Sequence, residues 1–367
     1  MKRIRVLYLI PHLQNQGPVI QLYSLIKNLD LDQISPFILT IFPERENSMV
    51  EKFRSLKVQV ICGNLKKWQI YSQIRLITET AKKIEPDVIH SCSTITDGLC
   101  ASVSFKQPLI ITLHNNMYED VVVQYGKLLG GYLCWREKKG IIKADCVVTC
   151  SKTLMNQYKK IIPREYVAIP NGIETNLWTN DTELDKKGLR KKLGLPINKY
   201  IIVSTGTLIE RKNPLMVIEA FKNANMEDAL LLIIGNGVLM DKCKEIANEN
   251  VMFTGRINNV KEYLYASDLL ISASSAEGLP YAILEAQCTG IPMILSDIPQ
   301  HREALGRNIG KVRFFEVGDK HKIVKLIKIR QGNGMVEYSI DEITAKSMAD
   351  RYMHQYINLI NKVIVSD

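Results

Sequence analysis

Short apolar runs alternate along the chain with longer segments in which apolar residues recur every three or four positions. The short runs indicate buried strands, and the periodic segments indicate amphipathic helices. In the first half we predict helices near 19–29, 49–56 and 70–84, and strands at 4–10, 37–41, 58–61, 88–89, 109–112 and 146–149. Because strands and helices alternate, we expect an α/β fold in which helices cover both faces of a parallel sheet.

The pattern is interrupted between residues 173 and 195, where polar and charged residues replace the apolar runs. Beyond this segment we predict strands at 201–204, 229–234, 251–254, 269–273 and 291–295. At the carboxyl end, the spacing of one helix face recurs in Met348, Tyr352, Tyr356, Ile360 and Val363. We therefore predict a domain over 1–175, a linker over 176–198, a second domain over 199–340 and a closing helical segment over 341–367.

Composition is that of a soluble globular protein, with 46% apolar and 23% charged residues. No apolar run approaches the roughly 18 residues of a transmembrane helix. The first run, which ends at Ile10, is interpreted as a strand and not as a signal peptide. The eight cysteines include no C-x2-C pair of the kind that binds metal. We expect reduced, buried thiols and hence a cytoplasmic protein.

Positive charge is concentrated in the first half of the chain. The formal net charge is +10; residues 1–180 hold 23 Lys and Arg against 15 Asp and Glu, and the remainder holds 25 against 23. Attraction to an anionic membrane, nucleic-acid binding and solubility are alternative explanations. Nucleic acid is the least favoured, because the basic residues are dispersed as pairs and form no recognisable DNA- or RNA-binding motif.

Two carboxylates eight residues apart, Glu277 and Glu285, carry the strongest indication of chemistry. Glu277 lies in a predicted loop after a strand, and Glu285 lies in a helix that begins near Pro280. Such a loop is at the carboxyl end of a parallel strand, where open α/β sheets bind ligands. Gly278 allows close approach of the backbone, and the helix N-terminus favours an anion. Carboxylates that can bind hydroxyls on either side of an anion predict a nucleotide sugar.

This segment resembles the E-x7-E signature of the retaining glycosyltransferases of group 1, or family 4, which have the GT-B fold. The flanking residues fall where that family's pattern has them: Ser274, Gly278-Leu279-Pro280, Ala286, Gly290-Ile291-Pro292, and Ser296-Asp297 through Glu303. The resemblance spans nearly the whole chain and implies two Rossmann-like domains facing across a cleft. It implies that domain 1–175 binds the acceptor, that domain 199–340 binds the nucleotide sugar, and that the final helix packs back on the first domain.

The resemblance also suggests roles for the carboxylates and for a basic turn. It implies that Glu277 orients the donor sugar and Glu285 the ribose. Arg211 and Lys212 suit a diphosphate, because Arg binds it through paired hydrogen bonds and Lys adds a point charge. Lys212, six residues after Gly206, falls at the family's phosphate-binding lysine.

Departures from the family pattern occur in the same region. The family usually has Arg directly after the glycine, where this chain has Thr207, so Arg211 is only a candidate substitute. Gly235-Asn236-Gly237 resembles a G-D-G turn with Asn in place of the acid, and a lone G-x-G is most often a tight turn. Arg256 follows the strand at which the family's backbone meets the nucleotide base.

In the first domain, Gly17 occupies the place of the family's glycine-rich loop on the acceptor side, with one glycine where two are common. Thr112-Leu113-His114 resembles the family's T-x-H motif, which implies that His114 lies near the donor sugar. Asp30-Leu31-Asp32 has the D-x-D form of metal-dependent glycosyltransferases, but its position after the first helix favours a surface turn. The sequence has no other cluster with metal-ligand spacing, so we expect no metal and no cofactor.

Residues 125–139 combine Leu128, Leu129, Tyr132 and Trp135 with several Lys and Arg. The pattern fits either a helix packed on the sheet or an amphipathic stretch at a membrane surface. The pair Gly130-Gly131 weakens a continuous helix. We favour packing, with membrane contact as the alternative.

The resemblance implies a retaining hexosyltransferase that moves a sugar from a UDP- or GDP-sugar to a hydroxyl of a glycan or lipid-linked acceptor. Bacterial surface polysaccharide, such as capsule or O-antigen, is the expected product. The alternatives are a GT-B nucleotide-sugar epimerase and a noncatalytic nucleotide-sugar-binding subunit. The expected location is the cytoplasm, with peripheral contact at the anionic inner face of the membrane as a further hypothesis and no nucleic-acid partner.

Overall fold

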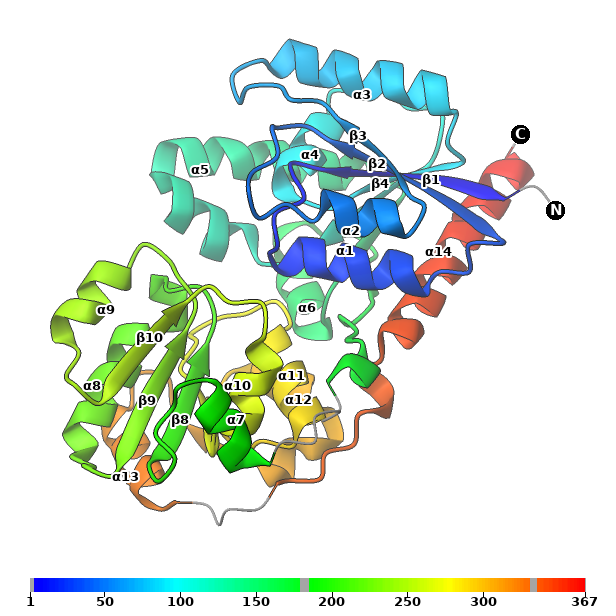
Figure 1. Cartoon of the computed structure of the whole chain (residues 1–367). Helices are drawn as coiled ribbons and strands as arrows, with labels where there is room; N and C mark the ends of the chain where they lie inside the picture. The colour runs from blue at the N-terminus through cyan, green and yellow to red at the C-terminus, as the bar shows by residue number, and fades with distance from the viewer. Residues whose placement is uncertain (1–2, 179–184, 331–334, 367) are drawn as a thin grey trace. The chain divides into compact units, whose positions relative to one another are not determined.

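The computed structural model describes residues 3–178, 185–330 and 335–366, in two compact units (Figure 1). Unit 1 comprises Met1–Glu174 and Ile343–Asp367, and unit 2 comprises Thr175–Glu342. Each unit is a parallel sheet with helices on both faces, so the predicted α/β class is confirmed. Among the described residues, no helix is both long enough and apolar enough to cross a membrane.

Unit 1 is built on a seven-stranded sheet in the order β3-β2-β1-β4-β5-β6-β7. Its strands are β1 (Ile4–Ile10), β2 (Ile34–Thr40), β3 (Gln59–Cys62), β4 (Val88–Ser91), β5 (Leu109–Leu113), β6 (Cys146–Thr149) and β7 (Val167–Ala168). Its α-helices are α1 (Gly17–Asn28), α2 (Val50–Ser55), α3 (Ile70–Ile84), α4 (Thr94–Cys100), α5 (Met117–Lys143), α6 (Lys152–Ile161) and α14 (Ala345–Ser366). The chain crosses from one half of the sheet to the other between β3 and β4, which places β1 beside β4.

Helices α1, α2 and α14 cover one face of this sheet. Val6, Tyr8 and Ile10 alternate onto that face and pack with apolar residues of the three helices. The Tyr356 hydroxyl of α14 hydrogen bonds to the Tyr8 hydroxyl (3.0 Å) and to His90 Nδ1 (2.8 Å). These buried hydrogen bonds fix the closing helix to unit 1; the side chain of Val363, predicted on its apolar face, lies outside the described residues.

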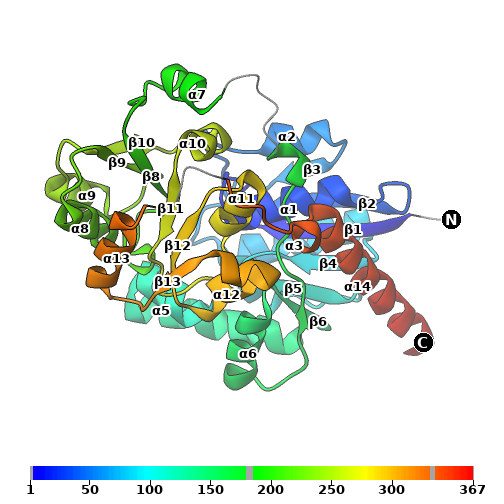
Figure 2. The ribbon, with the colours of Figure 1, turned by 90° about the horizontal axis from the view of Figure 1, so that it is seen from below.

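Unit 2 is built on a six-stranded parallel sheet in the order β10-β9-β8-β11-β12-β13, seen end on in Figure 2. Its strands are β8 (Tyr200–Thr205), β9 (Ala229–Ile234), β10 (Val251–Gly255), β11 (Leu269–Ser272), β12 (Met293–Ser296) and β13 (Arg313–Phe315). Its α-helices are α7 (Lys186–Lys192), α8 (Pro214–Ala224), α9 (Met240–Ile246), α10 (Val260–Ala266), α11 (Tyr281–Thr289), α12 (Pro299–Leu305) and α13 (Lys320–Lys328). Alternate residues of β8 face α8, α9 and α13 in an apolar core.

The observed elements differ from the predicted ones where side-chain patterning is weak. Ile291 and Pro292 precede β12 instead of belonging to it, because proline has no N–H to give to a neighbouring strand. The predicted linker 176–198 contains α7, whose buried Arg190 pairs with Asp268 (2.6 Å) within unit 2. Residues 179–184 of that linker lie outside the described residues.

Candidate functional site

The candidate donor site lies in unit 2, at the carboxyl ends of β8 and β11. From β8 the chain proceeds to β9 and β10 on one side, and then returns to build β11, β12 and β13 on the other. Neighbouring loops therefore diverge at the β8–β11 pair and leave space for a ligand. The loop after β8 carries Gly206, Arg211 and Lys212, and the loop after β11 carries Ser274 and Glu277.

Glycines allow the loops after β8 and β9 to interlock. Gly206 N donates to Ile234 O (2.9 Å), and Leu208 N donates to Asn236 O (3.1 Å). Gly206 and Gly235 have φ values of 142° and 139°, which side chains rarely tolerate. A Cβ atom on Gly235 would lie 1.9 Å from Gly206 O. The G-x-G turn is thus required by close backbone approach, and it supports the loop that carries the cations.

Glu277 brings the two predicted phosphate-binding cations together. Arg211 Nη1 donates to Glu277 Oε2 (2.8 Å) and to Ala276 O (2.7 Å), while Lys212 Nζ donates to Glu277 Oε1. Ser275 N donates to Arg211 O (2.8 Å), so the two loops are also joined through the backbone. The sequence predicted a sugar contact for Glu277; the structure shows this carboxylate as the hydrogen-bond partner of both cations.

The charge of Glu277 is set by these neighbours. Burial opposes ionisation of this carboxyl, but the charges of Lys212 and Arg211 and a hydrogen bond from Ser274 outweigh it and lower its pKa to about 2. Glu277 is therefore ionised throughout the physiological range. The three charged groups together hold one net positive charge, which suits an anionic ligand.

A second layer of hydrogen bonds holds the Glu277 loop from below. Ser296 Oγ, at the end of β12, donates to Ser274 O (2.6 Å), and His301 Nδ1 lies 2.8 Å from Ser296 O. His301 is completely buried, and its Nε2 has no hydrogen-bond partner among the described residues. Its burial lowers its pKa to about 4, so it is neutral at pH 7. Sequence reasoning missed His301; its only signal was a position within the matched segment from Ser296 to Glu303.

Glu285 is the second carboxylate of the motif, within α11. Its side chain is in a poorly solvated position, which raises its pKa to about 7, although the charge of Lys212 opposes this shift. The same lysine thus influences both carboxylates. Unlike Glu277, Glu285 lacks a cation partner close enough to overcome its desolvation, so it exchanges a proton near neutral pH.

The remaining predicted donor-site residues lie on the same edge of the sheet. Gly278, Leu279 and Pro280 are buried and lead directly into α11, whose first residue is Tyr281, as predicted. Arg256 follows β10 and is exposed. Gly255 before it accepts a hydrogen bond from Gly235 N (2.9 Å), which joins the third loop to the first two.

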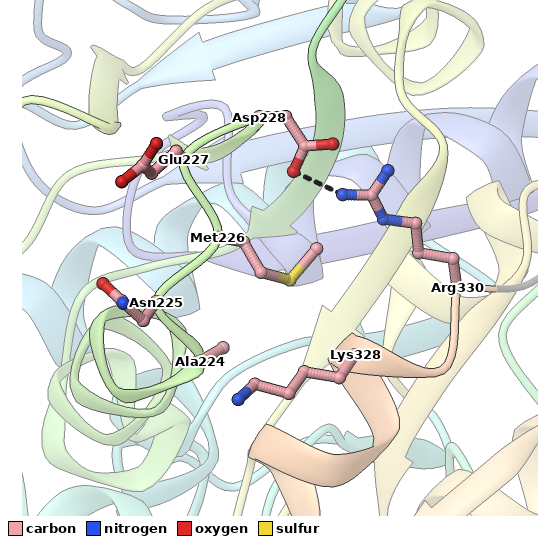
Figure 3. Close-up of a pocket in the computed structure, with 7 residues that line it drawn as sticks. All are labelled: Ala224, Asn225, Met226, Glu227, Asp228, Lys328 and Arg330. Atoms are coloured by element: carbon pink, nitrogen blue, oxygen red, sulfur yellow. Dashed lines mark hydrogen bonds and ion pairs between the residues drawn. The ribbon is translucent and has the colours of Figure 1, made fainter.

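A separate hollow of about 480 Å³ lies elsewhere on unit 2 (Figure 3). Its residues include Met226, Asp228, Lys328 and Arg330, and Asp228 is paired with Arg330. Asp228 directly precedes β9, so the hollow is at the amino end of the strands. It is not the candidate donor site, which lies at the opposite edge of the sheet.

In unit 1, His114 directly follows β5. Burial lowers its pKa to about 4, only partly opposed by a hydrogen bond with the backbone at Cys92, so the imidazole is neutral at pH 7. Its Nε2 has no hydrogen-bond partner among the described residues. Thr112 of the same motif is structural: its Oγ1 bonds to His90 Nε2 (2.7 Å) and to the Tyr352 hydroxyl (3.0 Å).

Unit 1 also holds two buried acids, Asp97 on α4 and Glu137 on α5. Burial raises the pKa of Glu137 to about 8. Burial and the neighbouring Glu137 raise the pKa of Asp97 well above its usual range. Among the described residues neither carboxyl forms an ion pair, so protonation is what keeps this position neutral. No sequence motif indicated this pair, because the residues are 40 positions apart.

The other candidates of unit 1 are simpler. Gly17 is exposed at the first residue of α1, and a Cβ atom built on it would meet nothing within 4 Å. Asp30 caps a surface turn by accepting from Asp32 N (3.0 Å) and Gln33 Nε2 (2.6 Å), as the surface-turn interpretation predicted. Within residues 3–178, 185–330 and 335–366, no group of three or more His, Cys, Asp or Glu is placed to hold a metal ion.

Comparisons with known proteins agree with this geometry. Residues 15–177 match the family model described as glycosyltransferase family 4, and residues 185–329 match the model described as glycosyl transferases group 1. Together the matches cover most of both units.

The individual proteins that this chain resembles include glycosyltransferases of known name. An Escherichia coli UDP-Gal:alpha-D-GlcNAc-diphosphoundecaprenol alpha-1,3-galactosyltransferase is 28% identical over 262 residues, 68% of this chain and 67% of the relative. The E. coli O-antigen biosynthesis glycosyltransferase WclY is 25% identical over 98% of this chain and 100% of its own length. The solved structure of Anabaena Alr3699/HepE in complex with UDP-glucose has a TM-score of 0.74 at 18% identity, covering 99% of both chains.

Proposed function

Because the chain belongs to the group 1, or family 4, glycosyltransferases with the GT-B fold, we propose that it is a retaining enzyme that transfers a hexose from a UDP- or GDP-sugar. The acceptor is a hydroxyl of a glycan or lipid-linked saccharide, in bacterial surface polysaccharide such as O-antigen or capsule. The observation that supports it best is the bridge that Glu277 forms between Arg211 and Lys212 at the β8–β11 divergence.

The proposed donor occupies this edge of unit 2. Its diphosphate binds Arg211, Lys212 and the N-terminal end of α11. Its sugar hydroxyls donate to Glu277, and its ribose hydroxyls donate to Glu285. Arg256 and the loop after β10 lie toward the base. The relatives whose names include UDP-Gal and UDP-glucose make a uridine nucleotide the first choice.

The proposed reaction needs no carboxylate nucleophile. The bond between the anomeric carbon and the diphosphate breaks, and the acceptor oxygen forms the new bond to that carbon on the same face of the sugar. The departing phosphate oxygen accepts the proton of the incoming hydroxyl. Arg211 and Lys212 stabilise the charge that develops on the leaving group, an effect expected to be large in a preorganised site. The neutral imidazole of His114 hydrogen bonds to a sugar hydroxyl through Nε2. No metal ion is part of the proposal.

The first test is thermal unfolding with UDP, GDP and ADP, each with EDTA or with Mg²⁺. A ligand that binds only the folded state raises the melting temperature by mass action. We expect a shift with one nucleotide that is the same in EDTA. The absence of any shift would contradict the donor site, and a shift that requires Mg²⁺ would contradict the metal-free mechanism.

Product analysis then tests the reaction itself. Incubation of the protein with the matching nucleotide sugar and membrane lipid extract is expected to yield a glycosylated acceptor in which the anomeric configuration of the donor is kept. An isomerised donor would indicate an epimerase, and an unchanged donor would indicate a noncatalytic subunit.

A further inference from the structure

One surface of unit 1 exposes apolar and aromatic side chains of a kind that is usually buried in the core of a globular protein. It is formed by the segment before α3 and by α5, which lie at the carboxyl edge of the sheet (Figure 1). The packing predicted for residues 125–139 is wrong for most of its large apolar side chains: Leu128 is 93% exposed, Leu129 53%, Trp135 52% and Tyr132 44%. Trp68, just before α3, is 74% exposed, and Tyr71, in the first turn of α3, is 90% exposed.

The shape of α5 explains how these residues are presented. The helix is kinked at Gly126, which has a φ of 78°, and it continues through Gly130-Gly131, the pair that was expected to weaken a continuous helix. The second arm crosses the first closely at Gly130, where a Cβ atom would lie 2.7 Å from Val122 Cα. Gly126 and Gly130 thus allow α5 to fold into a tight hairpin, and Leu128 and Leu129 lie at its turn.

The second arm of α5 carries an unpartnered stripe. Leu128, Tyr132, Trp135, Lys139 and Ile142 follow one another at intervals of four and three residues, and all five are exposed. This spacing puts them on one face of the helix. Tyr132 and Trp135 stack with ring centroids 6.0 Å apart. An apolar helix face of this kind normally packs against another helix or a sheet, and no described residue of unit 1 covers it.

Basic side chains are interleaved with these aromatic rings. Lys139 Nζ lies 3.8 Å from the centroid of the Trp135 ring, and Lys66 Nζ lies 5.0 Å from that of Trp68. Lys67 Nζ lies 6.0 Å from the Tyr125 ring, which joins the two segments into one surface. Long basic side chains beside Trp and Tyr are typical of proteins that sit at the interface between lipid headgroups and acyl chains.

Charge favours an anionic partner. The sequence has no Asp or Glu from Lys52 to Thr78, nor from Val121 to Arg136. Over the whole of unit 1, 26 Lys and Arg stand against 17 Asp and Glu, whereas unit 2 has 22 against 21. An anionic headgroup layer attracts such a surface. A second copy of the same net-positive surface would instead be repelled.

We propose that this aromatic–basic surface, formed by Lys66–Trp68, Tyr71 and the α5 hairpin from Tyr125 to Ile142, docks the protein on an anionic lipid bilayer. Leu128 and Leu129 enter the headgroup region, and the lysines bind lipid phosphates. Residues Lys66–Trp68 and the turn of the α5 hairpin lie on the same edge of the sheet as His114, whereas Ile142 leads into β6 at the opposite edge, so a lipid-linked acceptor would be held at the edge with His114. This inference adds a membrane-binding surface to the lipid-linked acceptor of the proposed function and to that extent rests on it; vesicle binding needs no sugar transfer, so the two can fail separately.

The test is sedimentation of the full-length chain with vesicles of equal parts phosphatidylglycerol and phosphatidylcholine, compared with pure phosphatidylcholine. We expect binding to the anionic vesicles that weakens with salt, and weak binding to the neutral ones. The variant Leu128→Glu/Leu129→Glu should reduce the partition coefficient at least ~10-fold. Ile329→Glu, at a 63% exposed position of unit 2, is the matched control and should bind normally. Lys67→Glu/Lys139→Glu should also weaken binding, whereas Lys187→Glu/Lys191→Glu should do so less.

Tryptophan fluorescence gives an independent measurement. Two of the three tryptophans, Trp68 and Trp135, belong to the surface, so their emission should shift to the blue on vesicle addition, and Trp68→Phe/Trp135→Phe should lose the shift. No binding to anionic vesicles, or equal binding by the Leu128→Glu/Leu129→Glu variant, would overturn the proposal. So would a dimer in sedimentation velocity that this variant dissociates, because the surface would then serve a second copy. A UDP-induced thermal shift that persists in the variant would leave the donor site unaffected.

Discussion

Two buried acids, Glu277 in unit 2 and Glu137 in unit 1, have pKa values shifted in opposite directions. In unit 2, Glu277 is buried beside Lys212 and Arg211, and its pKa falls to about 2. In unit 1, Glu137 is buried beside another acid, Asp97, and its pKa rises to about 8. Burial raises the pKa of both groups, and the neighbouring cations reverse the result in one of them. Glu277 is therefore ionised at neutral pH, whereas Glu137 keeps its proton.

This difference matches the two substrates of a glycosyl transfer. A nucleotide sugar brings a diphosphate, which a preformed cluster of charges can bind and later stabilise as a leaving group. The acceptor hydroxyl and the hydroxyls of the donor sugar are neutral, and in the proposed function the neutral imidazole of His114 hydrogen bonds to one of those sugar hydroxyls without a competing charge. The comparison predicts that changes to the charged groups Lys212 and Glu277 affect chemistry, whereas a change to the buried acid Glu137 affects mainly stability.

Removing Lys212 should have the largest effect. Lys212→Ala takes away one of two cations available to the leaving diphosphate, and we expect the rate of transfer to fall by about 10²- to 10³-fold. Release of the nucleoside diphosphate from the donor in the presence of acceptor measures the rate. Lys322→Ala, at an exposed position of the same unit, is the control and should be active. Near-normal activity of Lys212→Ala would contradict the leaving-group role.

Neutralising Glu277 should change binding and chemistry in opposite directions. In Glu277→Gln the two cations lose the carboxylate that pairs with them, so UDP alone should bind several-fold more tightly. Transfer should nevertheless fall about 100-fold, because the sugar loses a charged hydrogen-bond acceptor. Isothermal titration with UDP and the same rate assay measure the two quantities. Weaker binding of UDP to this variant would show that Glu277 does not compete with the diphosphate.

The acid pair of unit 1 should make stability depend on pH. In the unfolded chain Glu137 ionises above its ordinary pKa near 4.5, whereas in the folded chain it keeps its proton up to about 8. Between these values the folded state holds more protons, so the free energy of unfolding decreases as pH rises, by about 2 kcal/mol or more. Glu137→Gln should flatten this dependence in urea unfolding at pH 5 and pH 8. Glu79→Gln, an exposed acid on α3, should keep it; parallel pH dependences for wild type and Glu137→Gln would refute the assignment.

Glu285 should give the donor site a milder pH dependence. Its pKa of about 7 means that it is ionised at pH 8 and mostly protonated at pH 6. A carboxylate accepts ribose hydroxyls better than a carboxylic acid does, so the affinity for UDP should decrease up to about 10-fold as pH falls over this range. Glu285→Gln should bind weakly and without the dependence. A pH-independent affinity in the wild type would place Glu285 away from the ribose.

The sequence predicted the sheets well because their strands are continuous apolar runs, and β9 and β6 were predicted with their observed bounds. Helix α4 and strands β7 and β13 went unpredicted, since each is short and stabilised by contacts with distant segments. The hairpin of α5 also escaped prediction. Its exposed face has the same periodicity as a buried one, and periodicity alone does not show whether anything covers it.

For the candidate site, the motif predicted that Glu277, Arg211 and Lys212 belong to the same site. What the sequence could not show was their pairing, because a spacing of 65 residues contains no information about which atoms meet. The same limit hid the supporting His301 and the pair Asp97 and Glu137. Gly206 and Gly235 were recognised as turn residues, but the reason for them, contact between two loop backbones, required the structure.

Gly17 provides the smallest expected effect and a contrast with those glycines. Its φ is not in the left-handed region, and a Cβ atom there would meet nothing within 4 Å. Gly17→Ala should therefore change the free energy of unfolding by no more than about 0.5 kcal/mol, as for an ordinary exposed position. Thermal unfolding of the variant beside wild type measures it. If activity also stays normal, Gly17 does not contact the acceptor through its backbone. If activity falls while stability is unchanged, the acceptor lies in the open space beside Gly17, because only a bound ligand would then meet the added methyl group.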